Sequence, residues 1–216
     1  MNDQSAEQSP GISPSLLLLT VFYGGMVTIA GVLGAKQVAL GPLAVEAGIF
    51  PFLLLISISS SVAELHGKPT ADRLAQFGFV PLVGAILLSF FVLQLPTDPG
   101  MYEPAKAAFP IILGQSWRMM AAGVVAYGIS LTLNIWIFSR LRRSGGALAP
   151  LRGFIAAACS QVVDTLIFIT VSFYGVRPIG ELMLGQMIAK LVLSAVMVPV
   201  VIWLVVALGR RLDAKG

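Results

Sequence analysis

Six long apolar runs, almost free of charge, constrain this chain more than any other feature. They cover residues 15–35, 47–63, 75–96, 119–139, 153–176 and 182–208. Each approaches or exceeds the roughly 20 residues that a helix needs to cross a bilayer. Hydrophobic residues make up 57% of the chain and charged residues 11%, whereas soluble domains are about 25% charged. The sequence therefore predicts an all-α, polytopic membrane protein with six transmembrane helices.

The basic residues predict the orientation of these spans. Nine of the fourteen Lys and Arg residues follow the second, fourth or sixth run, which all end on one side. The positive-inside rule then places the N- and C-termini in the cytoplasm. Topology accounts for the net charge of +4, so no nucleic-acid partner is predicted.

The expected domain organisation is simple. Residues 1–14 are polar and rich in Ser, and we expect a disordered tail. A six-helix transmembrane domain covers 15–209, and a cytoplasmic tail covers 210–216. Residues 96–110 contain four prolines and a glycine, which predicts an external loop without a continuous helix. A multi-pass protein of the cell inner membrane is expected, with the lipid bilayer as its surroundings.

Asp164 is the residue that most strongly indicates function. Arg152 precedes it by twelve residues and Arg177 follows by thirteen, with no charge between them. In a helix the carboxylate lies roughly 18 Å from either charged end, at about 1.5 Å per residue. That is near the midplane of a roughly 30 Å hydrocarbon core, where an aspartate costs about 2.5–3.5 kcal/mol. Ionisable residues at this depth usually mark pathways or sites.

Several polar residues could act with this carboxylate. Gln161 lies one helical turn before Asp164 on the same face, and Ser160 is adjacent. Lys190 is the single charge in the sixth run, and it could be the counter-ion that makes Asp164 tolerable. A structural hydrogen-bond cluster between helices is the alternative interpretation.

The fourth and fifth runs repeat one pattern at intervals of four residues. The matching positions are Ala126, Ser130, Asn134 and Phe138, then Ala156, Ser160, Asp164 and Phe168. Each set forms one stripe on its helix. Asn134 and Asp164 therefore occupy equivalent positions, as in transporters whose internal repeats place polar groups near the midplane.

The stretch AACSQVVDTLIFITVSFYG, residues 157–175, resembles the signature of the queuosine precursor transporter family, also called the vitamin uptake transporter family. Weaker matches are Arg118 with residues 126–127, IFSRLR at 137–142, VAELHGKPTADRLAQFGF at 62–79, GQMIAK at 185–190, and Lys36 with Gln37. The resemblance covers about residues 20–199. It implies six spans with both termini inside and import of 7-deazaguanine bases, from which the tRNA nucleoside queuosine is made.

On this resemblance, the expected substrate-binding residues are Asp164, Gln161, Ser160, Asn134, Lys190, Glu64 and Arg118. Glu64 and Arg118 also lie near opposite span ends, where snorkelling to the headgroups is the cheaper explanation. Three positions depart from the family pattern. Ser60 stands where many members have an acidic residue, and Leu131 and Asn134 replace a second Gln-x-x-Asp motif. These departures bear on which base is carried.

The chemistry of a 7-deazaguanine suits these residues. Its N1–H and 2-amino groups can donate two parallel hydrogen bonds to the Asp164 carboxylate, with Gln161 and Asn134 beside it. Aromatic stacking would supply further affinity. The candidates are Tyr127, Trp136, Phe168 and Tyr174.

Three rival functions remain as alternatives. An intramembrane enzyme lacks support, because one histidine and one mid-span carboxylate assemble no catalytic or metal-binding constellation. A substrate-binding subunit of an energy-coupling-factor importer would also have six spans and would need separate ATPases. A structural assembly factor would bind no ligand. No cofactor is predicted, and a homodimer or an ATPase module as partner is left open.

Overall fold

The computed structural model describes residues 13–41, 43–114, 117–142, 148–175 and 179–214. Helices dominate it, and one short hairpin joins the first two. The elements in chain order are α1 (Pro14–Gly34), β1 (Gln37–Leu40), β2 (Leu43–Glu46), α2 (Ile49–His66), α3 (Lys68–Phe77), α4 (Phe79–Leu93), α5 (Glu103–Leu113), α6 (Trp117–Arg140), α7 (Ala149–Phe173) and α8 (Gly180–Asp213).

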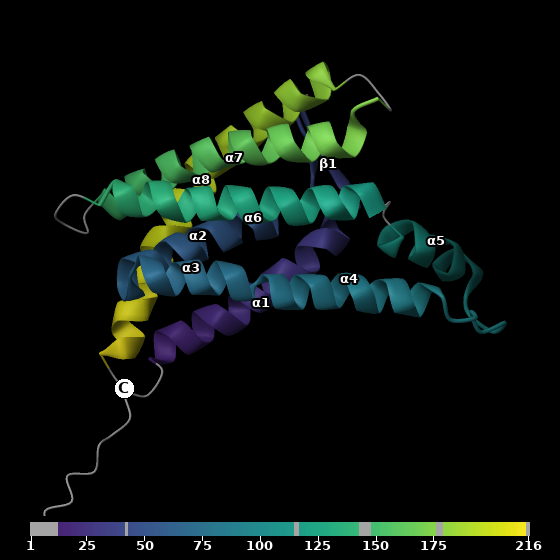
Figure 1. Ribbon diagram of the computed structural model, residues 1–216, viewed down its shortest axis with the longest axis horizontal. Coiled ribbons are helices and arrows are strands. Elements are labelled where there is room, and N and C mark those ends of the chain that lie inside the picture. Colours follow the sequence, from purple (N-terminus) through teal and green to yellow (C-terminus); the bar gives the residue numbers. More distant parts are fainter. Residues whose placement is uncertain (1–12, 42, 115–116, 143–147, 176–178, 215–216) are drawn as a thin grey trace, which may run out of the picture.

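The prediction of six transmembrane helices is confirmed. Within the described ranges, six helical segments are long and apolar enough to cross a membrane. They correspond to the six apolar runs, with α3 and α4 together forming the third segment, Lys68–Leu93. The ends of the bundle are distinct in Figure 1, where the hairpin and α5 lie opposite the C-terminus.

Helix α2 forms the centre of the bundle. It packs against α1, α3, α6 and α8, and most of its residues are buried. Ser57, Ser59 and Ser61 each donate a hydrogen bond to a carbonyl of their own helix. Small side chains whose hydroxyls are satisfied in this way let neighbouring backbones approach closely. By contrast, α4 has no buried residue and lies at the edge of the bundle.

The third predicted span starts earlier than expected and is broken. Residues 75–96 were expected, but the helix begins at Lys68 and is interrupted at Gly78, between α3 and α4. A Cβ at Gly78 would lie 2.3 Å from the Tyr127 hydroxyl and 2.7 Å from the Tyr23 ring. These two hydroxyls share a 2.7 Å hydrogen bond. Glycine is therefore needed where the break passes over this buried tyrosine pair.

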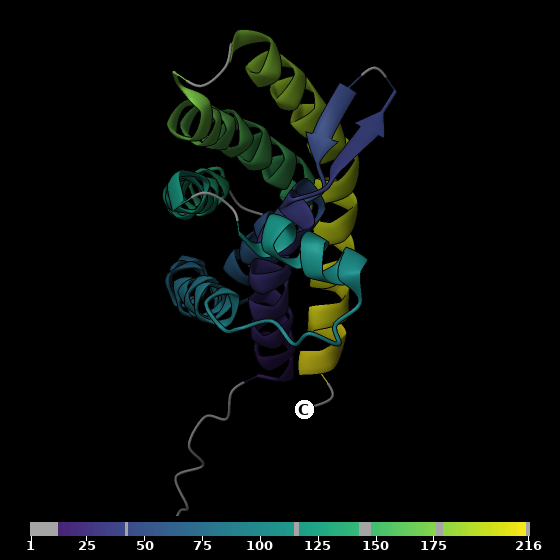
Figure 2. The same cartoon turned by 90° about the vertical axis from the view of Figure 1, so that its right-hand side faces the viewer.

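Two features between the spans differ from the expectation. Residues 96–102 are irregular, as expected, but α5 begins at Glu103 and contains Pro110, so the prediction for the second half of this loop is wrong. Pro104 lies in the first turn, where its missing N–H costs no hydrogen bond. The antiparallel hairpin was not expected from the sequence. Gln37 pairs with Glu46 in it, and Gly41 takes φ +61° at the turn. Figure 2 shows this hairpin projecting from one end of the bundle.

At the opposite end of the bundle, the start of α1 contacts the end of α8. The Ser15 backbone N–H and hydroxyl donate to the Asp213 carboxylate at 3.0 and 2.7 Å. His66 Nε2 lies 2.8 Å from the same hydroxyl. Helix α8 extends to Asp213, so the first part of the expected tail 210–216 is helical. The contacts with Ser15 hold this end of α8 beside the start of α1.

Candidate substrate site

A cavity of about 440 Å³ lies at the end of the bundle that carries the hairpin. This volume is within the roughly 300–1,000 Å³ typical of small-molecule pockets. The two strands and every helix except α3 contribute lining residues. Most of the lining is apolar, and its polar side chains include Gln37, Glu46, Tyr127, Asp164 and Lys190. A few polar groups in an apolar hollow are the usual composition of a ligand site.

Asp164 and Lys190 meet in the wall of this cavity. Lys190 Nζ, on α8, donates to Asp164 Oδ2, on α7, at 2.9 Å. The two side chains are 12% and 11% exposed. The Ser130 hydroxyl of α6, which has one proton to donate, lies 2.6 Å from the Ala126 carbonyl oxygen and 3.3 Å from the other carboxylate oxygen of Asp164. The counter-ion that the sequence suggested for Asp164 is thus in place, and three helices meet at this carboxylate.

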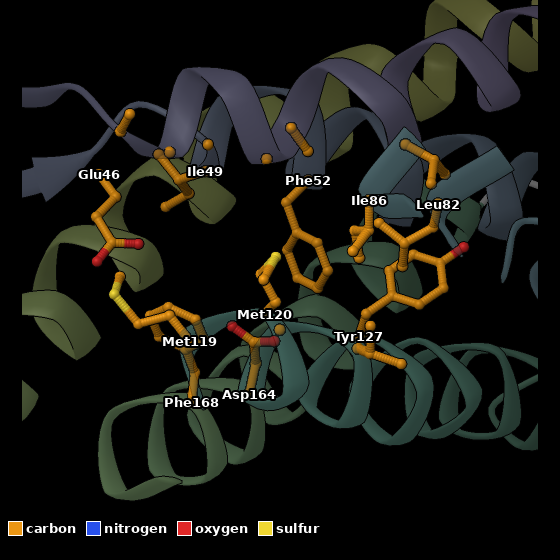
Figure 3. Close-up of a pocket in the computed structure, with 18 of the residues that line it drawn as sticks. Glu46, Ile49, Phe52, Leu82, Ile86, Met119, Met120, Tyr127, Asp164 and Phe168 are labelled. Carbon is orange, nitrogen blue, oxygen red and sulfur yellow. The ribbon is translucent and has the colours of Figure 1, made fainter. Parts of the chain in front are cut away.

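Aromatic side chains flank the ion pair. Figure 3 shows Phe52 across the hollow from Asp164 and Phe168. Tyr127 lines another part of the wall, where its ring packs edge-on against Phe79 at 5.0 Å between centroids. Tyr127 and Phe168 were among the four aromatics named from the sequence. The other two, Trp136 and Tyr174, are 54% and 68% exposed and do not line the cavity.

The hairpin supplies cavity residues that sequence reasoning missed. Gln37 of β1 and Glu46 of β2 are paired across the strands and both line the hollow. Figure 3 shows Glu46 projecting from the side opposite Asp164. Met119 and Met120, at the start of α6, were missed as well. A carboxylate beside an apolar span was the available signal for Glu46, but only the fold shows that the strand turns it inward.

Gln161, Ser160 and Asn134 are buried but do not line the cavity. The Ser160 hydroxyl donates to the Ala157 carbonyl of its own helix at 3.1 Å. Among the residues that the structure describes, neither the amide nitrogen nor the amide oxygen of Gln161 has a hydrogen-bond partner. Asn134 donates to Ser60 Oγ at 3.1 Å and joins α6 to α2. The expectation that these side chains stand beside the substrate at Asp164 does not match the cavity as it is formed here.

Helices α6 and α7, which carry the repeated stripes, are neighbours, and two of the positions that depart from the family pattern are in contact. The two helices pack side by side (Figure 1), and Ser130 of one stripe contacts Asp164 of the other. Asn134 contacts Ser60 directly, so two positions that depart from the family pattern touch each other. An acidic residue at position 60 would face the amide donor, whereas a serine makes a neutral contact.

Glu64 and Arg118 have partners away from the cavity. Arg152 of α7 donates to the Glu64 carboxylate of α2, and the two side chains are 6% and 5% exposed. Arg152 also lies over the Phe138 ring at 4.8 Å. Snorkelling is therefore the wrong interpretation of Glu64. Arg118 donates to the carbonyls of Val171 and Tyr174 at the end of α7 and so caps that helix.

Breaking the buried Glu64–Arg152 pair is expected to destabilise the protein. Arg152→Met leaves a carboxylate buried without its partner, which costs about 3–5 kcal/mol. The double variant Glu64→Gln/Arg152→Met removes both charges and should recover most of the loss. Thermal unfolding in detergent measures the difference, with exposed Arg211→Met as the control. Equal unfolding temperatures for Arg152→Met and Arg211→Met would contradict the expectation.

Six membrane-spanning helices around a hollow with a buried ion pair define a multi-pass membrane protein with a site for a small molecule. The model of the family described as "Putative vitamin uptake transporter" matches residues 46–204. The chain belongs to this family of transporters, which confirms the resemblance seen in the sequence. It is a transporter and not an enzyme.

A search of curated proteins adds a named relative. The chain is 27% identical over 164 residues to a Bacillus subtilis (strain 168) protein named "Probable queuosine precursor transporter". The match covers 74% of this chain and 70% of the relative. No solved structure matches the chain.

Proposed function

We propose that this protein imports 7-deazaguanine bases, the precursors of queuosine, across the cell inner membrane. The observation that carries the proposal is the Asp164–Lys190 ion pair in the wall of the cavity. The relative's name supports the same substrate class, and the family match supports a transporter.

The ion pair fits the hydrogen-bonding edge of such a base. That edge presents two donors, the 2-amino group and N1–H, followed by one acceptor, the carbonyl oxygen. A carboxylate accepts two parallel hydrogen bonds, and an ammonium group only donates. With Asp164 on the two donors and Lys190 on the carbonyl, the order of charges along the wall matches the order of groups on the base. Phe168 and Phe52 would hold the flat ring between them.

The direction of import rests on topology. The excess of basic residues after the second, fourth and sixth spans places the termini in the cytoplasm. The cavity lies at the opposite end of the bundle, among the end of α1, the hairpin and the start of α2. With this orientation the hollow would open toward the outside, and the Glu64–Arg152 pair and the Ser15–Asp213 contact would lie toward the inner end.

Complementation tests the proposal. A host lacking its own importer and its synthesis genes receives this chain and each base in turn, and tRNA is analysed for queuosine. Queuosine is expected only with the chain and a base together. Uptake into proteoliposomes holding this chain alone separates an autonomous importer from a subunit that needs ATPases. Absence of uptake in both systems would overturn the proposal.

Competition measures the edge recognition directly. Unlabelled guanine-edged bases should compete with labelled substrate, while 7-deazaadenine should compete at least about a hundredfold less well. The adenine-type edge has an acceptor in place of N1–H, so the Asp164 carboxylate would face a lone pair. Equal competition by the two bases would contradict recognition by this pair.

A further inference from the structure

Helix α7 carries a second polar position one turn beyond the cavity, toward the end that is closed. Gln161 is 1% exposed, and both its amide nitrogen and amide oxygen lack a partner within the part of the chain described here. Leaving buried donors and acceptors unpaired costs about 1–3 kcal/mol for each group. Such groups in a native protein need an explanation.

The packing of α7 against α8 gives Gln161 a neighbour. These helices run antiparallel, and two contacts fix their register. Lys190 bonds Asp164, and a Cβ at Gly153 would meet the side chains of Ile202 and Val198. Between these contacts, the same register puts Gln161 and Ser194 at about the same level along the two helices. The Ser194 hydroxyl is also fully buried and has no partner in the described ranges of the chain.

We infer that Gln161 and Ser194 form a second station for the base, which it reaches after leaving the Asp164–Lys190 pair. This inference rests on the proposed function. A carboxamide offers a donor beside an acceptor, and the ring N1–H and carbonyl of a 7-deazaguanine offer the complementary pair. The serine hydroxyl can accept from the 2-amino group. The unpaired groups of Gln161 and Ser194 thus match the hydrogen-bonding edge of the base, which becomes free when the base leaves the Asp164–Lys190 pair.

The position of the station suits a handover. Three residues separate Gln161 from Asp164, about 4.5 Å along the axis, so a base can exchange partners with a small displacement. A neutral station would hold the base less firmly than the charged pair, which favours release to the inside. Gln161 is buried and does not line the cavity in this conformation. Helices α7 and α8 must therefore separate locally before the base can reach it.

Comparing binding with transport tests the station. Gln161→Leu and Ser194→Ala are purified and assayed for equilibrium binding of the labelled cyano base in detergent, and for uptake into proteoliposomes. Binding should stay within about twofold of wild type, because neither residue lines the cavity. Uptake should fall roughly tenfold or more, as expected for one or two lost buried hydrogen bonds. Gln161→Met, which keeps the side-chain length, repeats the test if the leucine variant does not fold.

The control is Ser139→Ala, which removes another buried hydroxyl without a partner, at the end of α6 away from the α7–α8 contact. Its uptake should equal that of wild type. If binding and uptake fall together in Gln161→Leu, the residue belongs to the Asp164 site and the second station is wrong. If neither changes, the station is likewise wrong. A wild-type protein that neither binds nor imports the base would overturn the proposed function instead.

Discussion

Removing both members of the cavity ion pair, in Asp164→Asn/Lys190→Met, is expected to leave a folded protein that no longer imports the base. In the proposed site the carboxylate would accept from two donors of the substrate, and hydrogen bonds to charged groups contribute about 1.5–3 kcal/mol each. Losing two of them lowers the rate of import by roughly a hundredfold or more. Uptake of labelled base per folded molecule in proteoliposomes gives the measurement.

The single variants separate folding from function. Asp164→Asn leaves the Lys190 ammonium without its partner between α7 and α8, and Lys190→Met leaves the carboxylate unpaired. Each should cost about 3–5 kcal/mol and lower the folded yield, and the double variant should restore it. The control is Lys68→Met/Asp72→Asn, which removes a more exposed pair on α3. Wild-type import by the Asp164→Asn/Lys190→Met protein would show that the base does not use this carboxylate.

Filling the cavity from α6 is expected to block import without harming the fold. Gly123 lines the hollow, and a Cβ added there meets no atom within 4 Å. In Gly123→Leu the side chain extends into the space proposed for the base. Fitting extra methylenes beside a bound ligand costs about 1–3 kcal/mol, so import should fall roughly tenfold or more.

A matched glycine controls for the change itself. Gly84 on α4 is exposed, has no atom within 4 Å of an added Cβ, and does not line this cavity. Gly84→Leu should therefore import at the wild-type rate. Size-exclusion chromatography of both variants in detergent checks that each is folded. Import by Gly123→Leu at the rate of Gly84→Leu would mean that the base does not pass through this hollow.

The transmembrane helices could be predicted from the sequence because an apolar run of this length has few other folds available. The meeting of Asp164 and Lys190 could also be foreseen, since each is the only charge in its span and intramembrane charges usually pair. Both inferences depend on the bilayer as a solvent and not on details of packing. They needed no knowledge of which helices are neighbours.

The remaining site residues depend on how the helices pack. The spacing of Gln161 and Asp164 predicts a shared helix face, but a face can border two different neighbours, and only Asp164 reaches the cavity. Glu64 lies near a span end, where water would have been available, but Arg152 of a helix distant in sequence covers it. Glu46 required the hairpin, whose pairing cannot be recognised in ten residues between two apolar runs.

The pairing of Asp164 with Lys190 has an electrical consequence. A lone charge moved across a membrane potential of 100 mV gains or loses about 2.3 kcal/mol. The carboxylate and the ammonium carry opposite charges and lie in contact, so moving them together does almost no work against the voltage. For an uncharged base, this ion pair therefore gives the membrane voltage almost nothing to act on, and net accumulation would draw on consumption of the base inside the cell, a separate ion gradient or an ATPase partner.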